Sequence, residues 1–244
     1  MWPVLLALLF PALSLGSHFT WLSGGDSISW GCGNGFLPHE QNDGCEADAA
    51  AYRIPTAQAL EQANITVTTV GSRSAGPASS PLAWRAHEGH PGWRIDQLTA
   101  IVPAWAALAH AVVSLLAGAN DCLQGDGGAL AITRMRALLN ATTSLLPRAR
   151  ILVASILDLP GAGPKACQLA LNGALPALAA QAGASVTYVP MAENTQGVCG
   201  DGDATWNIGD RVHPNSAGHA RVASVLALYM RRALCPGFRT DVPC

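Results

Sequence analysis

The sequence predicts an α/β protein whose fold is a three-layer α/β/α sandwich. Short runs of apolar and β-branched residues alternate along the chain with longer runs that have helical periodicity. Five of the short runs are separated from one another by helix-like runs, which is the pattern of a parallel sheet covered by helices on both faces. A five-stranded parallel sheet is therefore expected.

Each expected element is supported by its own pattern. The strands are expected at residues 19–24, 66–70, 111–117, 151–156 and 185–189. The third of them is apolar at nearly every position, as a strand buried on both faces is. The helices are expected at residues 54–63, 95–108, 129–145, 165–182 and 216–232, and the last is amphipathic. The stretch 72–81, rich in Ser, Pro and Gly, predicts a surface loop.

The N-terminal segment predicts export. Residues 1–17 combine an apolar run with small residues at its end, which is typical of a secretory signal, and residues 18–244 then form a single domain. The segment lacks a basic residue before the apolar run, so a buried N-terminal helix is the alternative reading. Asn64 and Asn140 begin glycosylation acceptor triplets, which agrees with a secreted, extracellular protein.

Charge and hydropathy exclude several classes of partner. The net charge is −2, from 14 Lys and Arg against 16 Asp and Glu, so the chain has no basic footprint for nucleic acid. After the N-terminal segment no apolar run reaches the roughly 18 residues that a membrane helix needs. We therefore expect no membrane contact after signal removal, and a monomer.

Seven cysteines in an exported chain favour disulfides, because no Cys-x-x-Cys spacing occurs. An odd number leaves at least one thiol unpaired within the chain. Short loop closure suggests three pairs and leaves Cys122 alone, although sequence spacing does not fix the connectivity. The suggested pairs are Cys32 with Cys45, Cys235 with Cys244, and Cys167 with Cys199.

Four polar segments follow the expected strands at their carboxyl ends, where ligands bind in open parallel sheets. The segments are residues 25–27, 87–92, 118–121 and 210–215. Each has an ordinary explanation as a turn or as the start of a helix. Four such segments in order, each at the same edge of the sheet, are far less easily explained by turn preferences.

These segments contain the groups that acyl transfer requires. A serine hydroxyl attacks a carbonyl only with a base beside it and a carboxylate that orients the base, roles that Ser27, His213 and Asp210 fit. The spacing of Asp210 and His213 lets one short loop supply both groups. The oxyanion of the intermediate would be bound by the backbone N–H groups of Ser27 and Gly92 and by the side-chain amide of Asn120.

The motifs resemble those of the SGNH, or GDSL, hydrolase superfamily. The matching blocks are Gly25-Asp26-Ser27-Ile28, Gly92, Gly118-x-Asn120-Asp121 and Asp210-x-x-His213-Pro214-Asn215. The resemblance implies the same roles for Ser27, Gly92, Asn120, His213 and Asp210, and a flavodoxin-like strand order of 2-1-3-4-5. The longer runs 70–77 and 87–96 are similar to carbohydrate esterase family three, whose members remove acetyl groups from xylan. The chain departs from the common pattern at Ser29 and Ala119, where Thr is usual.

Aromatic and histidine side chains near these blocks have two readings each. Trp30, Trp93 and Trp206 are candidates for a substrate-binding platform that stacks on sugar rings, or they pack under loops. His87 and His90 flank Glu88, but without a fourth ligand we expect structural hydrogen bonds and no metal. No cofactor is expected.

The leading hypothesis is a secreted serine esterase that deacetylates plant cell-wall polysaccharide such as acetylated xylan. A broad-specificity carboxylesterase or lipase is the first alternative. The second is a non-catalytic carbohydrate-binding protein of the same fold.

Overall fold

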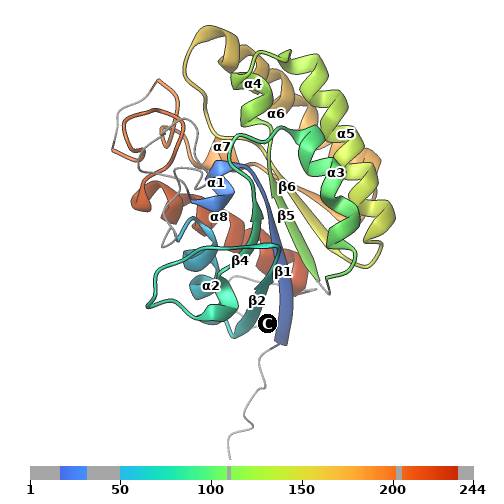
Figure 1. Cartoon of the computed structure of the whole chain (residues 1–244), viewed down its shortest axis with the longest axis vertical. Coiled ribbons are helices and arrows are strands. Elements are labelled where there is room, and N and C mark those ends of the chain that lie inside the picture. The colour runs from blue at the N-terminus through green and yellow to red at the C-terminus, as the bar shows by residue number, and fades with distance from the viewer. Residues whose placement is uncertain (1–16, 32–49, 109–110, 202–204, 236–244) are drawn as a thin grey trace, which may run out of the picture.

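A computed structural model describes residues 17–31, 50–108, 111–201 and 205–235 (Figure 1). Its centre is a parallel sheet whose five main strands lie in the order β2, β1, β5, β6, β7. These strands are β1 (Ser17–Gly25), β2 (Ile65–Val70), β5 (Val112–Leu116), β6 (Arg150–Ala154) and β7 (Val186–Val189). The predicted fold class is confirmed, and these five strands lie in the predicted relative order 2-1-3-4-5, although the whole sheet has more strands.

Two further strands extend the sheet and correct the prediction of five. The short strand β4 (Ala86–Gly89) pairs in parallel with the end of β1, through Gly24 and Gly25, and β3 (Arg73–Ser74) pairs antiparallel with β4. His87 and Glu88 lie in one of the polar segments expected to follow a strand, but both belong to a strand themselves, β4. Polar and charged residues without β-branched neighbours carry little strand signal, so these strands were missed.

Helices cover both faces of the sheet. On one face α3 (Ile95–Trp105), α5 (Gly127–Leu145) and α6 (Ala162–Ala182) pack side by side, while α2 (Arg53–Glu61) and α8 (Ser216–Leu234) pack together on the other (Figure 1). Short helices follow the strands, namely α1 (Ser27–Trp30), the 3-10 helix η1 (Leu82–Trp84), α4 (Ala119–Leu123) and α7 (Met191–Asn194). In the described part of the chain, no helix has the length and apolar character to cross a membrane.

The hydrophobic core lies between the sheet and the helices that cover its two faces. All five residues of β5 are buried, as its largely apolar sequence predicts. Trp21 of β1 is fully buried and donates its indole N–H to Ser114 Oγ on the neighbouring strand, at 2.8 Å. A buried indole N–H needs such a partner, so this bond satisfies the one polar atom that Trp21 brings into the core.

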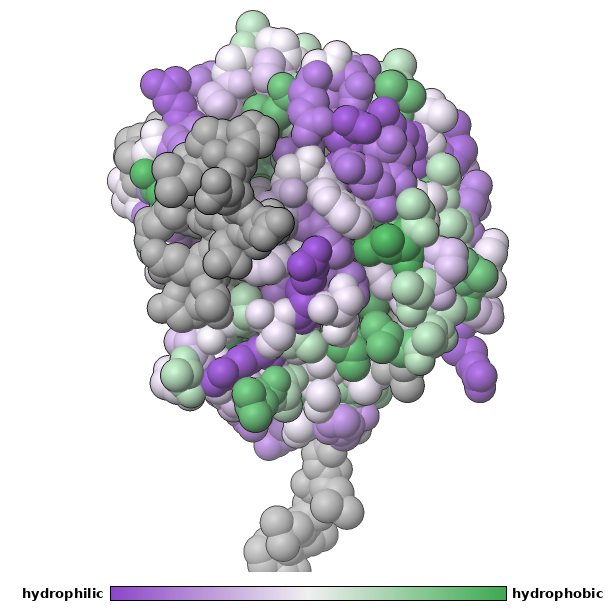
Figure 2. All heavy atoms as spheres, in the orientation of Figure 1, coloured by the Kyte–Doolittle hydropathy of each residue, from purple (hydrophilic) through white to green (hydrophobic). Residues whose placement is uncertain are grey.

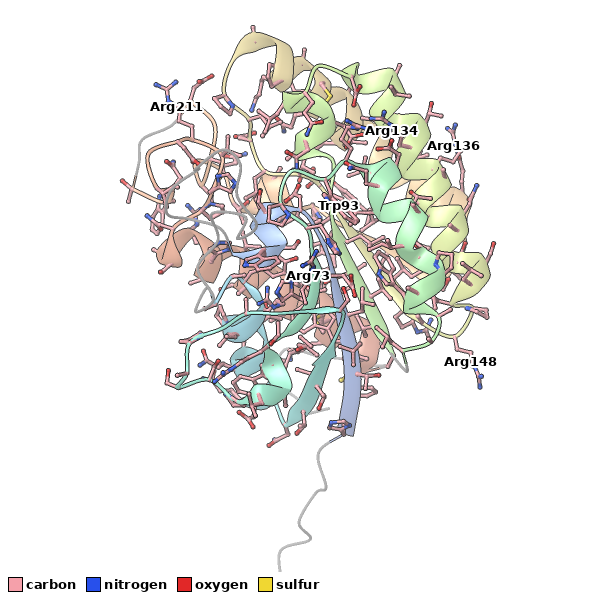
Figure 3. The ribbon with its side chains drawn as sticks, in the orientation of Figure 1. Arg73, Trp93, Arg134, Arg136, Arg148 and Arg211 are labelled. Carbon is pink, nitrogen blue, oxygen red and sulfur yellow. A yellow bond between two sulfur atoms is a disulfide. The ribbon has the colours of Figure 1, made fainter. Side chains whose placement is uncertain are left out.

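An ion-pair network lies at one end of the helical layer and reaches from the surface to the buried Asp121. Arg134 of α5 lies 2.8 Å from Asp121 and 2.5 Å from Asp126. Figure 2 shows the hydrophilic side chains of this region in its upper right, and Figure 3 labels Arg134 there. The network joins α4 to α5 at the carboxyl edge of the sheet.

The structure corrects part of the cysteine pairing. Cys122 is bonded to Cys167, so Cys122 is not the lone thiol and the expected pair of Cys167 with Cys199 is wrong. Cys199 is a buried free thiol. Cys235 is disulfide-bonded, and its expected partner Cys244 lies outside the described residues. The expected pair Cys32 with Cys45 and nearly all of the predicted signal segment also lie outside them.

Candidate active site

The turn that presents Ser27 is built by the residues around it. β1 ends at Gly25, and a Cβ there would collide with the backbone oxygen of Leu116 and with Ser29, so the close approach requires glycine. Asp26 then caps α1, because its carboxylate accepts a hydrogen bond from the Ile28 N–H at 3.0 Å. As a result Ser27 is the first residue of a helix, only 7% exposed, at the carboxyl end of the central strand.

The three residues predicted as a triad lie together. Ser27 Oγ is 2.8 Å from His213 Nε2, and His213 Nδ1 is 2.5 Å from Asp210 Oδ2. These distances place the imidazole between hydroxyl and carboxylate, in the order that proton transfer requires. Residues separated by 186 positions therefore meet at one edge of the sheet.

Local hydrogen bonds fix Asp210 for this arrangement. Its second oxygen accepts the backbone N–H groups of Val212 and His213, each at 2.9 Å, in a tight turn in which Arg211 has a left-handed φ of 66°. Burial raises the pKa of Asp210, but the hydrogen bonds from His213 and from the two N–H groups outweigh it and lower the pKa below its ordinary value. The carboxylate is thus ionised beside the imidazole at neutral pH.

A cavity of about 420 Å³ opens directly onto the triad. Its walls comprise the three triad residues, Asn120 and five apolar side chains, which are Ile28, Ala119, Leu123, Ile208 and Val212. An apolar cleft with a few converging polar groups is typical of a site for a small organic ligand or part of one.

The predicted oxyanion donors are brought together only in part. Asn120 follows β5 and lines the cavity, and its amide also donates to the carbonyl oxygen of Trp93 at 3.0 Å. Gly92 has a left-handed φ of 76°, and its carbonyl accepts the side-chain amide of Gln124 at 2.8 Å. Gly92 itself is not part of the cavity wall. The hydrogen bond between Asn120 and Trp93 nevertheless connects the loop that contains Gly92 to a residue of the cavity wall.

The three tryptophans do not form a common platform, and none lines the cavity. Trp93 stacks on the His90 ring with a centroid separation of 4.0 Å, and Figure 3 places it near the middle of the visible face. Trp30 contacts the edge of His87, and Trp206 lies under the guanidinium of Arg221. These contacts show all three packing against neighbouring side chains.

The His87, Glu88 and His90 cluster is held by hydrogen bonds. Glu88 accepts bonds from His90 Nε2 at 2.8 Å and from both the backbone and the hydroxyl of Ser72. His87 Nδ1 accepts a hydrogen bond from the Gly89 N–H at 3.0 Å. Burial lowers the pKa of His87 to about 2. Within the described ranges, no group of three or more His, Cys, Asp or Glu could hold a metal ion.

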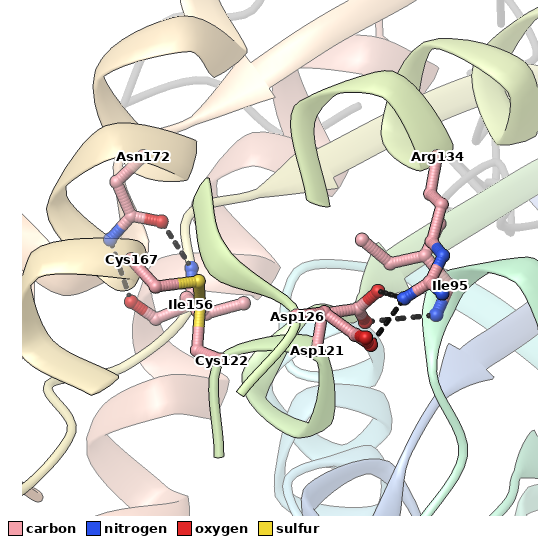
Figure 4. The surroundings of a disulfide bond; sticks show 8 residues. All are labelled: Ile95, Asp121, Cys122, Asp126, Arg134, Ile156, Cys167 and Asn172. Atoms are coloured by element: carbon pink, nitrogen blue, oxygen red, sulfur yellow. Dashed lines mark hydrogen bonds and ion pairs between the residues drawn. A yellow bond between two sulfur atoms is a disulfide. The ribbon is translucent and has the colours of Figure 1, made fainter. Parts of the chain in front are cut away.

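Asp121 anchors the block that contains Asn120. Its carboxylate accepts the backbone N–H of Ile95 at 3.0 Å and the guanidinium of Arg134, and Cys122 next to it is tied to α6 by the disulfide (Figure 4). Burial raises the pKa of Asp121 despite these bonds. The block is therefore fixed to α3, α5 and α6 at once.

Two buried residues near the triad were not singled out by the sequence. Asp26 is fully buried, and desolvation raises its pKa to about 6 although His213 nearby favours its charged form. Arg53 is also fully buried and bonds to backbone carbonyls of α1. Asp26 could have been found from its position before Ser27, whereas nothing in the local sequence marks Arg53.

Comparisons with known proteins agree with this geometry. The model of the GDSL-like Lipase/Acylhydrolase family matches residues 25–221, from the Ser27 turn to helix α8. No curated protein matches the chain. The family 3 carbohydrate esterase of Clostridium thermocellum is 25% identical, with a TM-score of 0.71 over 89% of this chain and 99% of that one.

Two other solved structures share the fold. A carbohydrate esterase family 3 protein from Talaromyces cellulolyticus has a TM-score of 0.67 at 21% identity, over 88% of this chain and 97% of that one. A variant of an acetyl-xylooligosaccharide esterase from Geobacillus has a TM-score of 0.60 at 19% identity, over 93% and 97%. The family match covers most of the sequence and includes every block around the cavity, and we conclude that the chain belongs to the GDSL-like lipase/acylhydrolase family.

Proposed function

We propose that the protein is a serine ester hydrolase in which Ser27 is the nucleophile, His213 the general base and acid, and Asp210 the residue that orients His213. The observation that carries the proposal is the continuous relay from Ser27 Oγ through His213 to Asp210, at 2.8 and 2.5 Å, on the wall of a cavity.

The reaction follows from this geometry in two steps. Ser27 Oγ attacks the ester carbonyl carbon while its proton passes to His213 Nε2, and the tetrahedral intermediate collapses as His213 protonates the departing alcohol. Water then attacks the acyl-enzyme, gives its proton to His213, and the acid leaves as Ser27 regains its proton. Asp210 stabilises the imidazolium formed in each step and remains ionised.

The negative oxygen of each intermediate needs donors that are in place beforehand. Asn120 lines the cavity, and the Ser27 N–H lies at the N-terminus of α1, where N–H groups have no partner within the helix. The Gly92 N–H completes the proposed set of three. The loss of one such donor lowers kcat by roughly 10²–10³.

The proposed substrate is an acetylated polysaccharide such as xylan. Similarity to the Clostridium thermocellum carbohydrate esterase over nearly the whole of both chains supports this choice.

Export would bring the enzyme to such a polymer, and Asn64 and Asn140 are both exposed, as glycosylation sites must be. We propose a secreted glycoprotein that is monomeric. The N-terminal sequence of material exported from a eukaryotic host, its mass before and after deglycosylation, and light scattering test these points.

A carboxylesterase or lipase for longer acyl chains is the second candidate, and the cavity is the observation that favours it. Five of its nine lining residues are apolar, and its volume exceeds what an acetyl methyl group fills. Rates on p-nitrophenyl acetate, butyrate and octanoate distinguish the two candidates. A fall in kcat/KM with chain length supports the deacetylase, and a rise toward octanoate overturns it in favour of the second candidate.

The decisive experiment for the substrate is acetate release from acetylated xylan, compared with acetylated mannan and pectin at equal acetyl content. Preferential release from xylan by the wild type, and none by Ser27→Ala of unchanged circular dichroism, supports the proposal. Equal rates on all three polymers would contradict the xylan assignment. Hydrolysis of p-nitrophenyl acetate by Ser27→Ala at the wild-type rate would contradict the nucleophile itself.

A further inference from the structure

Arg53, at the start of α2, is fully buried and forms hydrogen bonds with the helix that presents Ser27. Its guanidinium donates hydrogen bonds to the carbonyl oxygens of Ser29 and Trp30, the latter at 3.2 Å, and to that of Ala75 at 3.0 Å. Two of these three acceptors are the last carbonyls of α1. The side chain therefore links the nucleophile helix to the segment after β3.

A buried arginine is an unusual choice for a purely structural contact. Moving a guanidinium from water into the interior is costly, and in the described part of the chain no carboxylate forms an ion pair with Arg53. Burial lowers its pKa to about 10, so it is still protonated at neutral pH. Among the described residues, backbone carbonyls compensate for the charge, and those carbonyls belong to the segments around Ser27.

The charge complements the end of α1 that it touches. The C-terminal carbonyls of a helix lack intrahelical partners and carry partial negative charge, so a cation stabilises them. In a helix of four residues, Ser27 at the first position and the carbonyls at the last belong to a single turn. A shift of these carbonyls would move the Ser27 hydroxyl relative to His213 Nε2.

The neighbouring residue Tyr52 holds the same turn by binding the side chain of Ser29. The Tyr52 hydroxyl bonds to Ser29 Oγ at 2.7 Å and to Ser23 Oγ on β1 at 3.1 Å. Tyr52 and Arg53 thus fix both the side chain and the carbonyl of Ser29. α1 also packs closely on Gly25 and Gly89, where a Cβ would collide with Ser29 and Trp30, so these polar contacts act on a turn that is already tightly packed.

We propose that Arg53 is a positioning residue for the nucleophile, which holds the α1 turn so that Ser27 Oγ stays within reach of His213. The inference rests on the proposed esterase function. It assigns to Arg53 no contact with substrate, because Arg53 is not part of the cavity wall. Its effect should therefore fall on kcat and not on substrate binding.

Arg85 is the matched control. Within the described residues its guanidinium also bonds to backbone carbonyls, those of Ala78 at 2.9 Å and Ser80 at 2.6 Å, which lie in the same loop after β3 and not in α1. A loss of general loop stability would appear in both arginine variants. A loss of nucleophile alignment would appear in the Arg53 variants alone.

The experiment compares wild type, Arg53→Met, Arg53→Lys and Arg85→Met, with kcat and KM for p-nitrophenyl acetate and the rate of Ser27 phosphonylation. Urea unfolding confirms that each variant is folded. We expect kcat and the phosphonylation rate of Arg53→Met to fall about 100-fold with KM changed less than threefold, as a small displacement of a reacting group does. Arg53→Lys recovers part of this loss, and Arg85→Met keeps kcat within about twofold.

The outcomes separate the inference from the function on which it rests. A folded Arg53→Met with kcat within twofold of wild type overturns the positioning role, as does a rise in KM alone. If Arg53→Met does not fold, Arg53→Lys decides, because one ammonium cannot span carbonyls on two segments and should lower kcat about tenfold. Wild-type kcat in that variant overturns the inference. A wild-type protein without any esterase activity contradicts the proposed function instead.

Discussion

The side-chain amide of Asn120 donates a hydrogen bond to the carbonyl oxygen of Trp93, 3.0 Å away. One residue therefore both lines the cavity beside Ser27 and holds the loop that begins at Gly92. An amide nitrogen carries two hydrogens, so one is committed to Trp93 while the other remains available for a developing oxyanion.

Replacing Asn120 with Ala removes both functions. We expect kcat for a small acetyl ester to fall by roughly 10²–10³, because a preorganised donor is lost, with a smaller change in KM. Steady-state kinetics of p-nitrophenyl acetate measure this. Asn140→Ala on the exposed face of α5 is the control and should leave kcat unchanged. An Asn120→Ala enzyme with wild-type kcat would rule out a role in oxyanion binding.

Asp210→Asn tests the orientation of the base. An amide carries no charge to stabilise an imidazolium, and its NH2 can donate to His213 Nδ1 and so favour the wrong tautomer. We therefore expect kcat to fall by roughly 10³–10⁴ at neutral pH. Asp201→Asn on the same loop, an exposed residue 3.4 Å from Arg211, should have little effect. Comparable losses in both variants would mean that loop charge, and not the contact with His213, is responsible.

Asp26 makes the free energy of unfolding depend on pH. Its pKa is raised from 3.8 to about 6 by burial. A carboxyl with a raised folded-state pKa contributes stability that is complete below pH 3.8 and is lost as the pH rises through about 6. Asp26→Asn keeps an oxygen to cap Ile28 and does not ionise.

The stability of Asp26→Asn relative to wild type should therefore increase between pH 4 and 6 and level off above. The total change is about 3 kcal/mol, since one pKa unit corresponds to about 1.4 kcal/mol. Urea unfolding of both proteins from pH 4 to 8 measures the difference. A difference that does not vary with pH would show that Asp26 titrates alike in the folded and unfolded states.

The Cys122–Cys167 disulfide ties α4, which bears Asn120, to α6. It joins residues 45 positions apart, and removal of such a crosslink costs about 2–4 kcal/mol of unfolding free energy. We expect this loss in the double variant Cys122→Ser, Cys167→Ser.

Free Cys199 is buried and burial raises the pKa of its thiol, so native protein should react slowly with iodoacetamide. Rapid alkylation of Cys199 would contradict its buried position.

The sequence was sufficient to predict the elements with strong periodicity. The apolar run of β5 and the amphipathic helix α8 were predicted within a few residues, because burial determines their patterns. The contact of Ser27 with His213 followed from the rule that the carboxyl ends of parallel strands share one edge.

The remainder depended on three-dimensional packing. β4 pairs with β1 through only two residues, and its polar sequence carries no strand signal. The partner of Cys122 is set by the packing of α4 against α6, and sequence spacing cannot report it. Arg53 resembles a surface residue by type, and only the fold shows that its acceptors lie inside.

The central claim is that Ser27 is a nucleophile activated by His213. Incubation with a p-nitrophenyl phosphonate, followed by peptide mass spectrometry, tests it most directly. The structure predicts a single adduct on the peptide that contains Ser27, absent in Ser27→Ala and formed far more slowly in His213→Ala. No adduct on the folded wild-type protein, or an adduct that forms equally fast without His213, would contradict it.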